Sequence, residues 1–408
     1  MLSWLQNQVV FSAVLSLVLI AGMMTCVAYC IYFERKISAW IQDRQGPNRV
    51  GFLGLFGNFH FWGLGQPIAD GAKFFLKEDI IPARVDKPLF ILAPAISMIV
   101  ALIGFVVIPW GGSYMLGDTL MNVQVANPDV GLLYILGVGS MGVYGVVLGG
   151  WASNNKYSMY GAVRATAQML SYEIPMGVAI LVVVLASGQL RLEEIVLGQV
   201  GGNGLWNIVL HPVSFLILLI TLFAETNRAP FDLAEAEQEL VGGFHTEYSS
   251  MKFAMFFLGE YVHMITGSAF ICVLFLGGWE LSFFGIGPAF PGTGIEDVGL
   301  ISVIIKIGVL AVKVAFFIFL FMLVRWTLPR FRFDQLMRLA WKGLIPVSLG
   351  ILVLTVMGVY MGWQRSVLFN LGSEIAIVAA TLGVVILANK PVTGRQDNMP
   401  VVTQPLGG

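Results

Sequence analysis

The sequence predicts an all-α polytopic membrane protein with about nine transmembrane helices. Hydrophobic residues make up 57% of its 408 residues and charged residues only 12%, and the mean hydropathy is +0.82. Such a composition is typical of a chain that lies in the bilayer. A hydrocarbon core about 30 Å thick requires about 20 apolar residues per spanning helix. The candidate runs are 10–33, 88–110, 130–151, 162–188, 212–227, 252–279, 300–326, 344–362 and 367–388.

We expect residues 1–390 to form one transmembrane helical domain, followed by a disordered tail over 391–408. The fifth apolar run is short, and we expect its helix to continue from residues just before His211. Three isolated cysteines (Cys26, Cys30 and Cys272) have no metal-ligand spacing, so neither a zinc site nor an iron–sulfur cluster is expected.

Residues 52–77 are apolar and aromatic, but we do not expect them to span the membrane. Glycines, Asp70 and Lys73 interrupt the run, and Trp62 suits the headgroup region. The pattern favours an amphipathic segment at the membrane surface.

The distribution of Lys and Arg predicts the orientation of the chain. Nine helices would place nineteen of the 23 Lys and Arg residues on one side and only Arg191 and Arg365 on the other. The remaining two, Lys306 and Lys313, fall within the seventh run. Because cytoplasmic loops carry an excess of Lys and Arg, we expect the N-terminus outside and the acidic loops inside.

The stretch 225–250 is unusually acidic for this chain. Pro230 suits the first turn of a helix and the Gly242-Gly243 pair would end it, so 230–241 is predicted to be a short helix. A solvated acidic loop is the simpler alternative, but apolar residues interleave the acids, which such a loop does not need. The stretch contains only one base, Arg228, before Glu247. Its acids are Glu225, Asp232, Glu235, Glu237, Glu239 and Glu247.

Several ionisable residues fall inside the predicted helices, where charge is costly and usually functional. Glu173, Glu225 and Glu260 lie in the inner halves of three different helices. They form either static ion pairs or a group that shares few cations and passes protons at neutral pH. Glu374 lies near the start of the last helix and is expected at the interface.

The sequence motifs resemble a known family of membrane subunits. They are ERK at 34–36, RQGPNRVG at 44–51, QPIADGAKFFLKED at 66–79, NKYSMYGAVRATAQMLSYEIP at 155–175, FAETNRAPFDLAEAEQELVGGFHTEYSSMKFAMFFLGEY at 223–261 and TLPRFRFDQLMRLAWK at 327–342. From its first helix to about residue 362, the chain resembles the H subunits of bacterial proton-pumping NADH:quinone oxidoreductases, whose mitochondrial counterpart is a core membrane chain of complex I.

The resemblance implies a membrane-arm subunit that forms most of the quinone tunnel and couples quinone reduction to proton translocation. It implies partners among the other complex I subunits, a bacterial inner membrane, quinone as substrate, and NADH, FMN and iron–sulfur clusters on partner subunits. No nucleic-acid partner is expected. For quinone binding it implies Glu34, Arg35, Arg44, Arg49, Asp70, Lys73, Arg228, Asp232 and Glu247. For the proton path it implies Glu173, Glu225, Glu235, Glu237, Glu239 and Glu260.

Two departures from the family pattern limit this transfer. Residues 52–65 are longer than the family's usual link, and the helix expected over 367–388 is absent from shorter members. Two other functions remain as alternatives: a membrane subunit of a related hydrogenase-type complex, and an autonomous proton or cation carrier. The motifs GPNRVG and ETNRAPFDL count against the hydrogenase-type subunit. The absence of a visible inverted repeat counts against the autonomous carrier.

Overall fold

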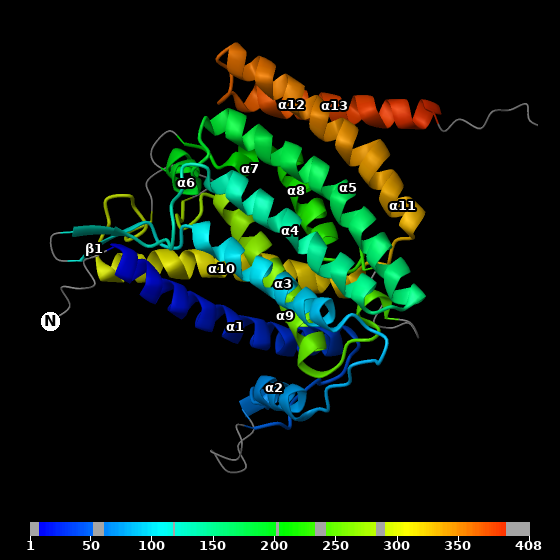
Figure 1. Ribbon diagram of the computed structural model, residues 1–408. Helices are drawn as coiled ribbons and strands as arrows, with labels where there is room; N and C mark the ends of the chain where they lie inside the picture. Colours follow the sequence, from blue (N-terminus) through cyan, green and yellow to red (C-terminus); the bar gives the residue numbers. More distant parts are fainter. Residues whose placement is uncertain are drawn as a thin grey trace, which may run out of the picture.

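The computed structural model describes residues 8–51, 61–116, 119–200, 204–232, 242–282 and 290–388. Long helices lie side by side, and the segments that connect them gather at two opposite ends of the bundle (Figure 1). The hairpin, α6 and α7 lie at one end, and the turns after α4 and α8 lie at the other. This alternation is the topology expected of a polytopic membrane protein.

The bundle is built around α9. In its most apolar 18-residue window 78% of the residues are buried, against 6% in α1, so α9 is central and α1 is peripheral. The helices of the bundle are α1 (Gln8–Ile41), α3 (Lys87–Ile103), α4 (Gly131–Ala152), α5 (Lys156–Ser187), α8 (Pro212–Glu225), α9 (Ser250–Phe275), α10 (Leu300–Thr327), α12 (Ile345–Tyr360) and α13 (Val367–Ala388).

Shorter elements connect these helices. They are the helices α2 (Gln66–Leu76), α6 (Leu192–Gln199), α7 (Asn207–Leu210) and α11 (Phe333–Arg338), the 3-10 turns η2 (Phe61–Gly63), η3 (Gly104–Val107) and η4 (Gly243–His245), the π-helical turn η5 (Leu339–Leu344), and the antiparallel hairpin of β1 (Ser113–Leu116) and β2 (Thr119–Asn122).

Small residues allow α3 and α4 to pack closely. A Cβ atom at Gly145 would lie 3.0 Å from the Cβ of Ser97 and 3.1 Å from its backbone nitrogen. Close approach through small residues is typical of membrane helices. Lipid is as apolar as the side chains, so van der Waals packing rather than the hydrophobic effect drives helix association.

The predicted fold class is confirmed. Among the described residues eight helices are long and apolar enough to cross a membrane, and the shorter apolar helix α8 covers the fifth run. With 14 residues, α8 is about 21 Å long at 1.5 Å per residue. The preceding α7 does not join it, because His211 adopts φ −134° and ψ 64° ahead of Pro212 and a residue before proline disfavours the helical region.

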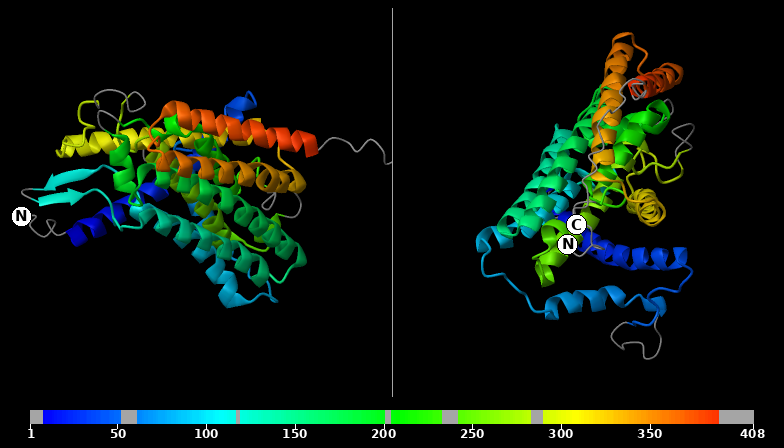
Figure 2. Two further views of the ribbon diagram at one scale, coloured as in Figure 1. Left: turned by 90° about the horizontal axis from the view of Figure 1, so that it is seen from above. Right: turned by 90° about the vertical axis from the view of Figure 1, so that its right-hand side faces the viewer.

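Helix α2 covers part of the predicted amphipathic segment, of which residues 52–60 lie outside the described residues. It lies below α1 (Figure 2, right), and the Ser250 hydroxyl at the start of α9 donates to the carbonyls of Phe74 and Lys77 at 2.9 and 3.0 Å. Its apolar side chains Ile68, Phe75 and Leu76 are exposed. That this helix lies at a membrane surface remains a prediction.

The helix predicted over 230–241 does not begin at Pro230. Residues 230–232 form a turn and bend, and 233–241 lie outside the described residues. The carbonyl of Pro230 accepts from the Phe331 backbone N–H at 3.2 Å, and that of Phe231 accepts from the Gln168 side chain at 2.9 Å. These carbonyls therefore bind groups outside the segment instead of helical N–H groups.

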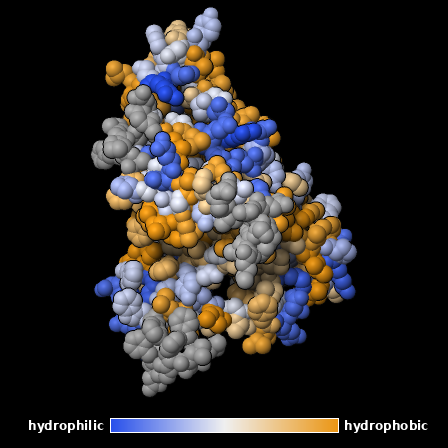
Figure 3. Space-filling view, turned by 90° about the vertical axis from the view of Figure 1, so that its left-hand side faces the viewer, coloured by the Kyte–Doolittle hydropathy of each residue, from blue (hydrophilic) through white to orange (hydrophobic). Residues whose placement is uncertain are grey.

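The end of the bundle that carries the N-terminus of α1 and the hairpin has a mixed surface. Polar and apolar side chains are interspersed over it (Figure 3). Such a surface suits helix ends and their connecting loops better than helix sides that contact lipid.

Candidate functional site

The turn that follows α8 brings polar and charged groups together at one end of the bundle. The buried carboxylate of Glu34, on α1, accepts a hydrogen bond from Arg228 at 3.0 Å and from the Tyr261 hydroxyl at 2.6 Å. Arg325, on α10, donates to the other oxygen of Glu34. We call these four residues the Glu34 cluster. It joins α1, α9, α10 and the turn.

Arg228 links this cluster to a further acid. Its guanidinium is 4% exposed, lies 3.9 Å from the centre of the Tyr261 ring, and places Nε 3.9 Å from Oε2 of Glu260. Burial by itself lowers the pKa of Arg228, but Tyr261, Glu34 and Glu260 raise it by more, so its pKa lies well above the usual value. Arg228 is therefore a permanent cation between two carboxylates.

Glu260 and Glu225 line one small cavity of about 30 Å³, which we call the Glu260 cavity. A cavity needs roughly 10–15 Å³ to hold one water molecule, together with polar partners for it. The Glu260 cavity meets both conditions. Its other lining residues are Ser97, Gly142, Val146, Met169, Thr226, Asn227, Phe244, Phe256 and His263.

Glu173 approaches the same region from α5. Its carboxylate accepts a hydrogen bond from Ser140 of α4, and it lies close enough to Glu225 for the two charges to repel each other. Glu225 thus lies near both of the other carboxylates, with Glu260 lining the same cavity and Glu173 on the neighbouring helix α5.

The turn itself is held by one buried carboxamide. The Gln168 side chain of α5 donates to the carbonyls of Ala224 and Phe231 and to Oδ1 of Asn227, at 2.9–3.2 Å. It thereby fixes the path of the chain on both sides of Arg228.

The residues predicted around the quinone entrance do not all come together. Arg35 forms an ion pair with Asp70 at 2.8 Å, which ties α1 to α2. Arg44, Arg49 and Lys73 are exposed, apart from the buried Glu34.

The acidic stretch is anchored at both of its described ends. Asp232 forms an ion pair with Arg330 at 3.1 Å, and Glu247 accepts a hydrogen bond from Asn155 at 2.7 Å. Burial beside aromatic rings lowers the pKa of His245 to about 4, so this histidine is neutral at pH 7. Glu235, Glu237 and Glu239 lie outside the described residues.

The intramembrane lysines make structural contacts. Lys313 donates to the carbonyls of Leu276 and Gly278, just beyond the end of α9, and Lys306 donates to the carbonyl of Asp297. Cations at the C-terminal end of a helix are favourable, because its last carbonyls lack helical donors.

Glu374, expected at the interface, lies near the start of α13 and packs against the start of α8. This carboxylate is 1% exposed and binds the start of α8. It accepts from the Val213 N–H at 2.7 Å and the Ser214 hydroxyl at 3.1 Å, and it lies 3.2 Å from Nδ1 of His211. The first turn of a helix offers free N–H donors, which explains why a buried carboxylate is tolerated there.

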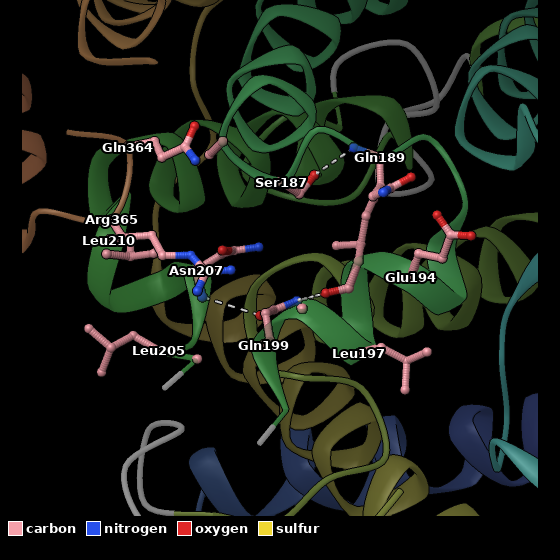
Figure 4. A pocket seen from close by; sticks show the side chains of 14 residues that line it. Ser187, Gln189, Glu194, Leu197, Gln199, Leu205, Asn207, Leu210, Gln364 and Arg365 are labelled. Atoms are coloured by element: carbon pink, nitrogen blue, oxygen red, sulfur yellow. Dashed lines mark hydrogen bonds between the residues drawn. The ribbon is translucent and has the colours of Figure 1, made fainter. Parts of the chain in front are cut away.

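A larger cavity of about 330 Å³ lies at the opposite end of the bundle (Figure 4). Its polar residues bind one another and the backbone. Gln199, for example, accepts from the backbone N–H groups of Asn207 and Gly277 and donates to the carbonyl of Val273. These groups fasten α6 and α7 to the end of α9. The Glu260 cavity is therefore a better candidate for the functional site than this larger cavity.

Sequence reasoning missed four residues of the site. Gln168 lies on α5, Tyr261 and His263 on α9, and Arg325 on α10. The hydrogen-bond partners of Gln168, Tyr261 and Arg325 are distant in the sequence, and His263 lines a cavity with residues of other helices. The polar character of Arg325 and His263 inside apolar runs was the available signal. Within the described ranges, no three His, Cys, Asp or Glu side chains are placed to hold a metal ion.

Comparisons with known proteins agree on one family. The family model described as NADH dehydrogenase matches residues 14–356. The H subunit of NADH-quinone oxidoreductase from Leptospira biflexa is 47% identical over 356 residues, covering 84% of this chain and 94% of the relative. An H subunit of the same enzyme from Cytophaga hutchinsonii is 46% identical, covering 86% and 96%, and one from Solibacter usitatus is 42% identical, covering 88% and 98%.

Proposed function

Because this chain belongs to the NADH dehydrogenase family, as the H subunit of NADH-quinone oxidoreductase, we propose that it lines the quinone tunnel and couples quinone reduction to proton translocation. The observation that carries this proposal is the Glu260 cavity. It places two carboxylates from different helices beside space for water, and Arg228 joins it to the Glu34 cluster.

The chain works within complex I in this proposal and is not catalytic alone. Its three cysteines are scattered in apolar runs, so NADH, FMN and iron–sulfur clusters would be held by partner subunits of the hydrophilic arm. Neighbouring membrane-arm subunits and lipid complete its surroundings. We place it in the inner membrane of a bacterium, with the N-terminus outside and the acidic loops in the cytoplasm.

The quinone would approach along α1 and α2. Arg44, Arg49 and Lys73 offer exposed positive charge to its polar headgroup, beside the exposed apolar side chains of α2. The remaining proposed contacts lie deeper or in the acidic stretch. They are Glu34, Arg35, Asp70, Arg228, Asp232 and Glu247.

Coupling follows from the position of Arg228. Reduction of a quinone to a quinol takes up two electrons and two protons. Between the arrival of the electrons and the uptake of the protons, the quinone site beside the Glu34 cluster carries extra negative charge. Since Arg228 lies between Glu34 and Glu260, any shift of its guanidinium toward Glu34 weakens its hold on the negative charge of Glu260 and favours proton uptake there. Glu260, Glu225 and Glu173 would pass this proton, and Glu235, Glu237 and Glu239 would supply it.

Glu225 provides the direct test. Glu225→Gln keeps the shape and hydrogen bonding of the side chain but cannot titrate. We expect the complex to assemble and quinone-coupled pumping to fall by about tenfold or more, because a positioned proton carrier contributes about 10²–10⁴-fold. Glu225→Asp should retain more of both. The abundance of the complex and the protons pumped per electron are measured in the same membranes.

The two possible roles of this carboxylate give different results. A static structural role predicts low abundance with normal pumping per electron. Normal abundance with normal pumping in Glu225→Gln would remove Glu225 from the proton path.

A further inference from the structure

Resting on the proposed function, we propose that His263 is a proton-carrying residue that connects Glu260 to Glu225. A second cavity of about 50 Å³, which we call the Thr266 cavity, lies beside the Glu260 cavity and also has room for water. The two cavities have three lining residues in common, Glu225, Thr226 and His263. His263 therefore stands where one cavity meets the other.

The glycines of α4 show which way the two titratable side chains face. Gly139 lines only the Thr266 cavity, and a Cβ atom there would lie 3.3 Å from Oε1 of Glu225. Gly142 lines only the Glu260 cavity, and a Cβ atom there would lie 3.8 Å from Nε2 of His263. The imidazole thus presents a nitrogen to the cavity of Glu260, and the carboxylate presents an oxygen to the other cavity.

Both groups lie against α4. Positions three apart on a helix are neighbours, with Cβ atoms roughly 5–6 Å apart. Oε1 of Glu225 and Nε2 of His263 each lie against one of the neighbouring positions Gly139 and Gly142. Water in the two cavities would bridge the remaining separation.

Imidazole is suited to this position because it has two ring nitrogens, one protonated and one free when it is neutral. A proton leaves the carboxyl of Glu260 through water and binds the free ring nitrogen of His263. The imidazolium then releases the proton on its other nitrogen to water and on to the Glu225 carboxylate. Glu260 becomes charged, Glu225 becomes neutral, and the ring regains its first tautomer by turning. No electrons are exchanged.

Glu225, Glu260 and His263 are the titratable residues among the described lining of the two cavities. The negative charge of Glu225 stabilises the imidazolium, and the cation Arg228 on the far side of Glu260 disfavours it. The proton is therefore driven toward Glu225 and away from the Glu34 cluster.

The test compares His263→Gln with Glu225→Gln and a control, His211→Gln, in the assembled complex. His211 precedes α8 and lines neither cavity. Pumping is normalised to NADH oxidation with a hydrophilic acceptor, so a fall in abundance does not affect the result. We expect His263→Gln to reduce normalised pumping by about tenfold or more and to change its pH profile, with His211→Gln close to the parent.

Each outcome decides the matter. Normal normalised pumping and an unchanged pH profile in His263→Gln would overturn this proposal, even if abundance fell, because a purely structural role moves abundance alone. If Glu225→Gln loses pumping while His263→Gln keeps it, the proposed function stands and the histidine step is wrong. If both keep it, Glu225 and His263 both lie outside the proton path, and the coupling route of the proposed function fails together with this proposal.

Discussion

At the scale of single residues, the Glu34 carboxylate gathers three donors. It receives two guanidinium groups and one hydroxyl from three other parts of the chain. A buried ion pair gains stability only when hydrogen bonds satisfy its remaining lone pairs. The Tyr261 hydroxyl supplies such a bond. Removing this hydroxyl therefore measures how much the bond contributes to the stability of the Glu34 cluster.

We expect Tyr261→Phe to lower the stability of the assembled complex by about 1.5–3 kcal/mol, the usual contribution of a hydrogen bond to a charged group. Thermal unfolding in mild detergent measures the change. Tyr144→Phe, on the exposed face of α4, is the control and should have little effect. Equal stability of both variants and the parent would show that the Tyr261 hydroxyl contributes nothing.

The sequence identifies the acids of this site better than their partners. Glu173, Glu225 and Glu260 stand out because charge is rare in apolar runs, and Arg228 because it is the one base in the acidic stretch. Glu34 is implied by the resemblance of the motifs to the family. Tyr261 and Arg325 bind Glu34 across 227 and 291 positions of the chain. No periodicity within one helix can reveal contacts of that separation.

At the scale of elements, α5 holds the acidic stretch in place through a glycine. A Cβ atom at Gly161 would lie 2.8 Å from the carbonyl carbon of Gly243 and from the nitrogen of Phe244, both of them backbone atoms. Backbone atoms cannot turn away as a flexible side chain does. Therefore η4 can pack this closely against α5 only if position 161 has no side chain.

Gly161→Ala should therefore displace η4 at a cost of about 1–3 kcal/mol, the usual cost of overpacking. The expected results are faster proteolysis within 242–249 and lower quinone-coupled activity. Gly177→Ala is the matched control, because this glycine lies on the same helix with nothing within 4 Å of its Cβ position. Equal proteolysis in both variants would contradict the proposed seating.

Hydropathy locates the apolar part of each helix but not its polar continuations. The first helix, expected over 10–33, runs to Ile41, and the fourth, expected to begin at 162, begins at Lys156. Charged residues interrupt the apolar signal in both extensions: Glu34, Arg35 and Lys36 in the first and Lys156 in the second. At Lys156 the deciding interaction is a cap, in which the Asn155 side chain accepts from the Tyr157 N–H at 3.0 Å.

At the scale of the whole molecule, the exposed surface around the end of α1 and α2 needs partners. Trp40, Trp62, Phe75 and Leu76 are exposed there, together with Arg44. Grouped apolar side chains of this size mark a surface that contacts protein, lipid or ligand. We expect quinone and the hydrophilic-arm subunits to meet the chain here.

Arg44→Ala should slow quinone reduction about tenfold, since the loss of one hydrogen bond to a charged group costs about 1.5–3 kcal/mol. NADH oxidation by a hydrophilic acceptor should survive, because it is measured before quinone. Arg365→Ala, an exposed arginine at the opposite end of the bundle, should leave both activities unchanged. A parallel fall of both activities in Arg44→Ala would point to a defect of assembly.

The contact between Glu374 and the start of α8 has a consequence for synthesis. Glu374 follows Val213 by 161 residues. At about 5–20 residues per second, α8 emerges from the ribosome roughly 8–30 s before the carboxylate that binds its first turn. During that interval the start of α8 lacks one of its native acceptors. The helix that ends at Glu225 thus acquires its final anchorage only when α13 has been made.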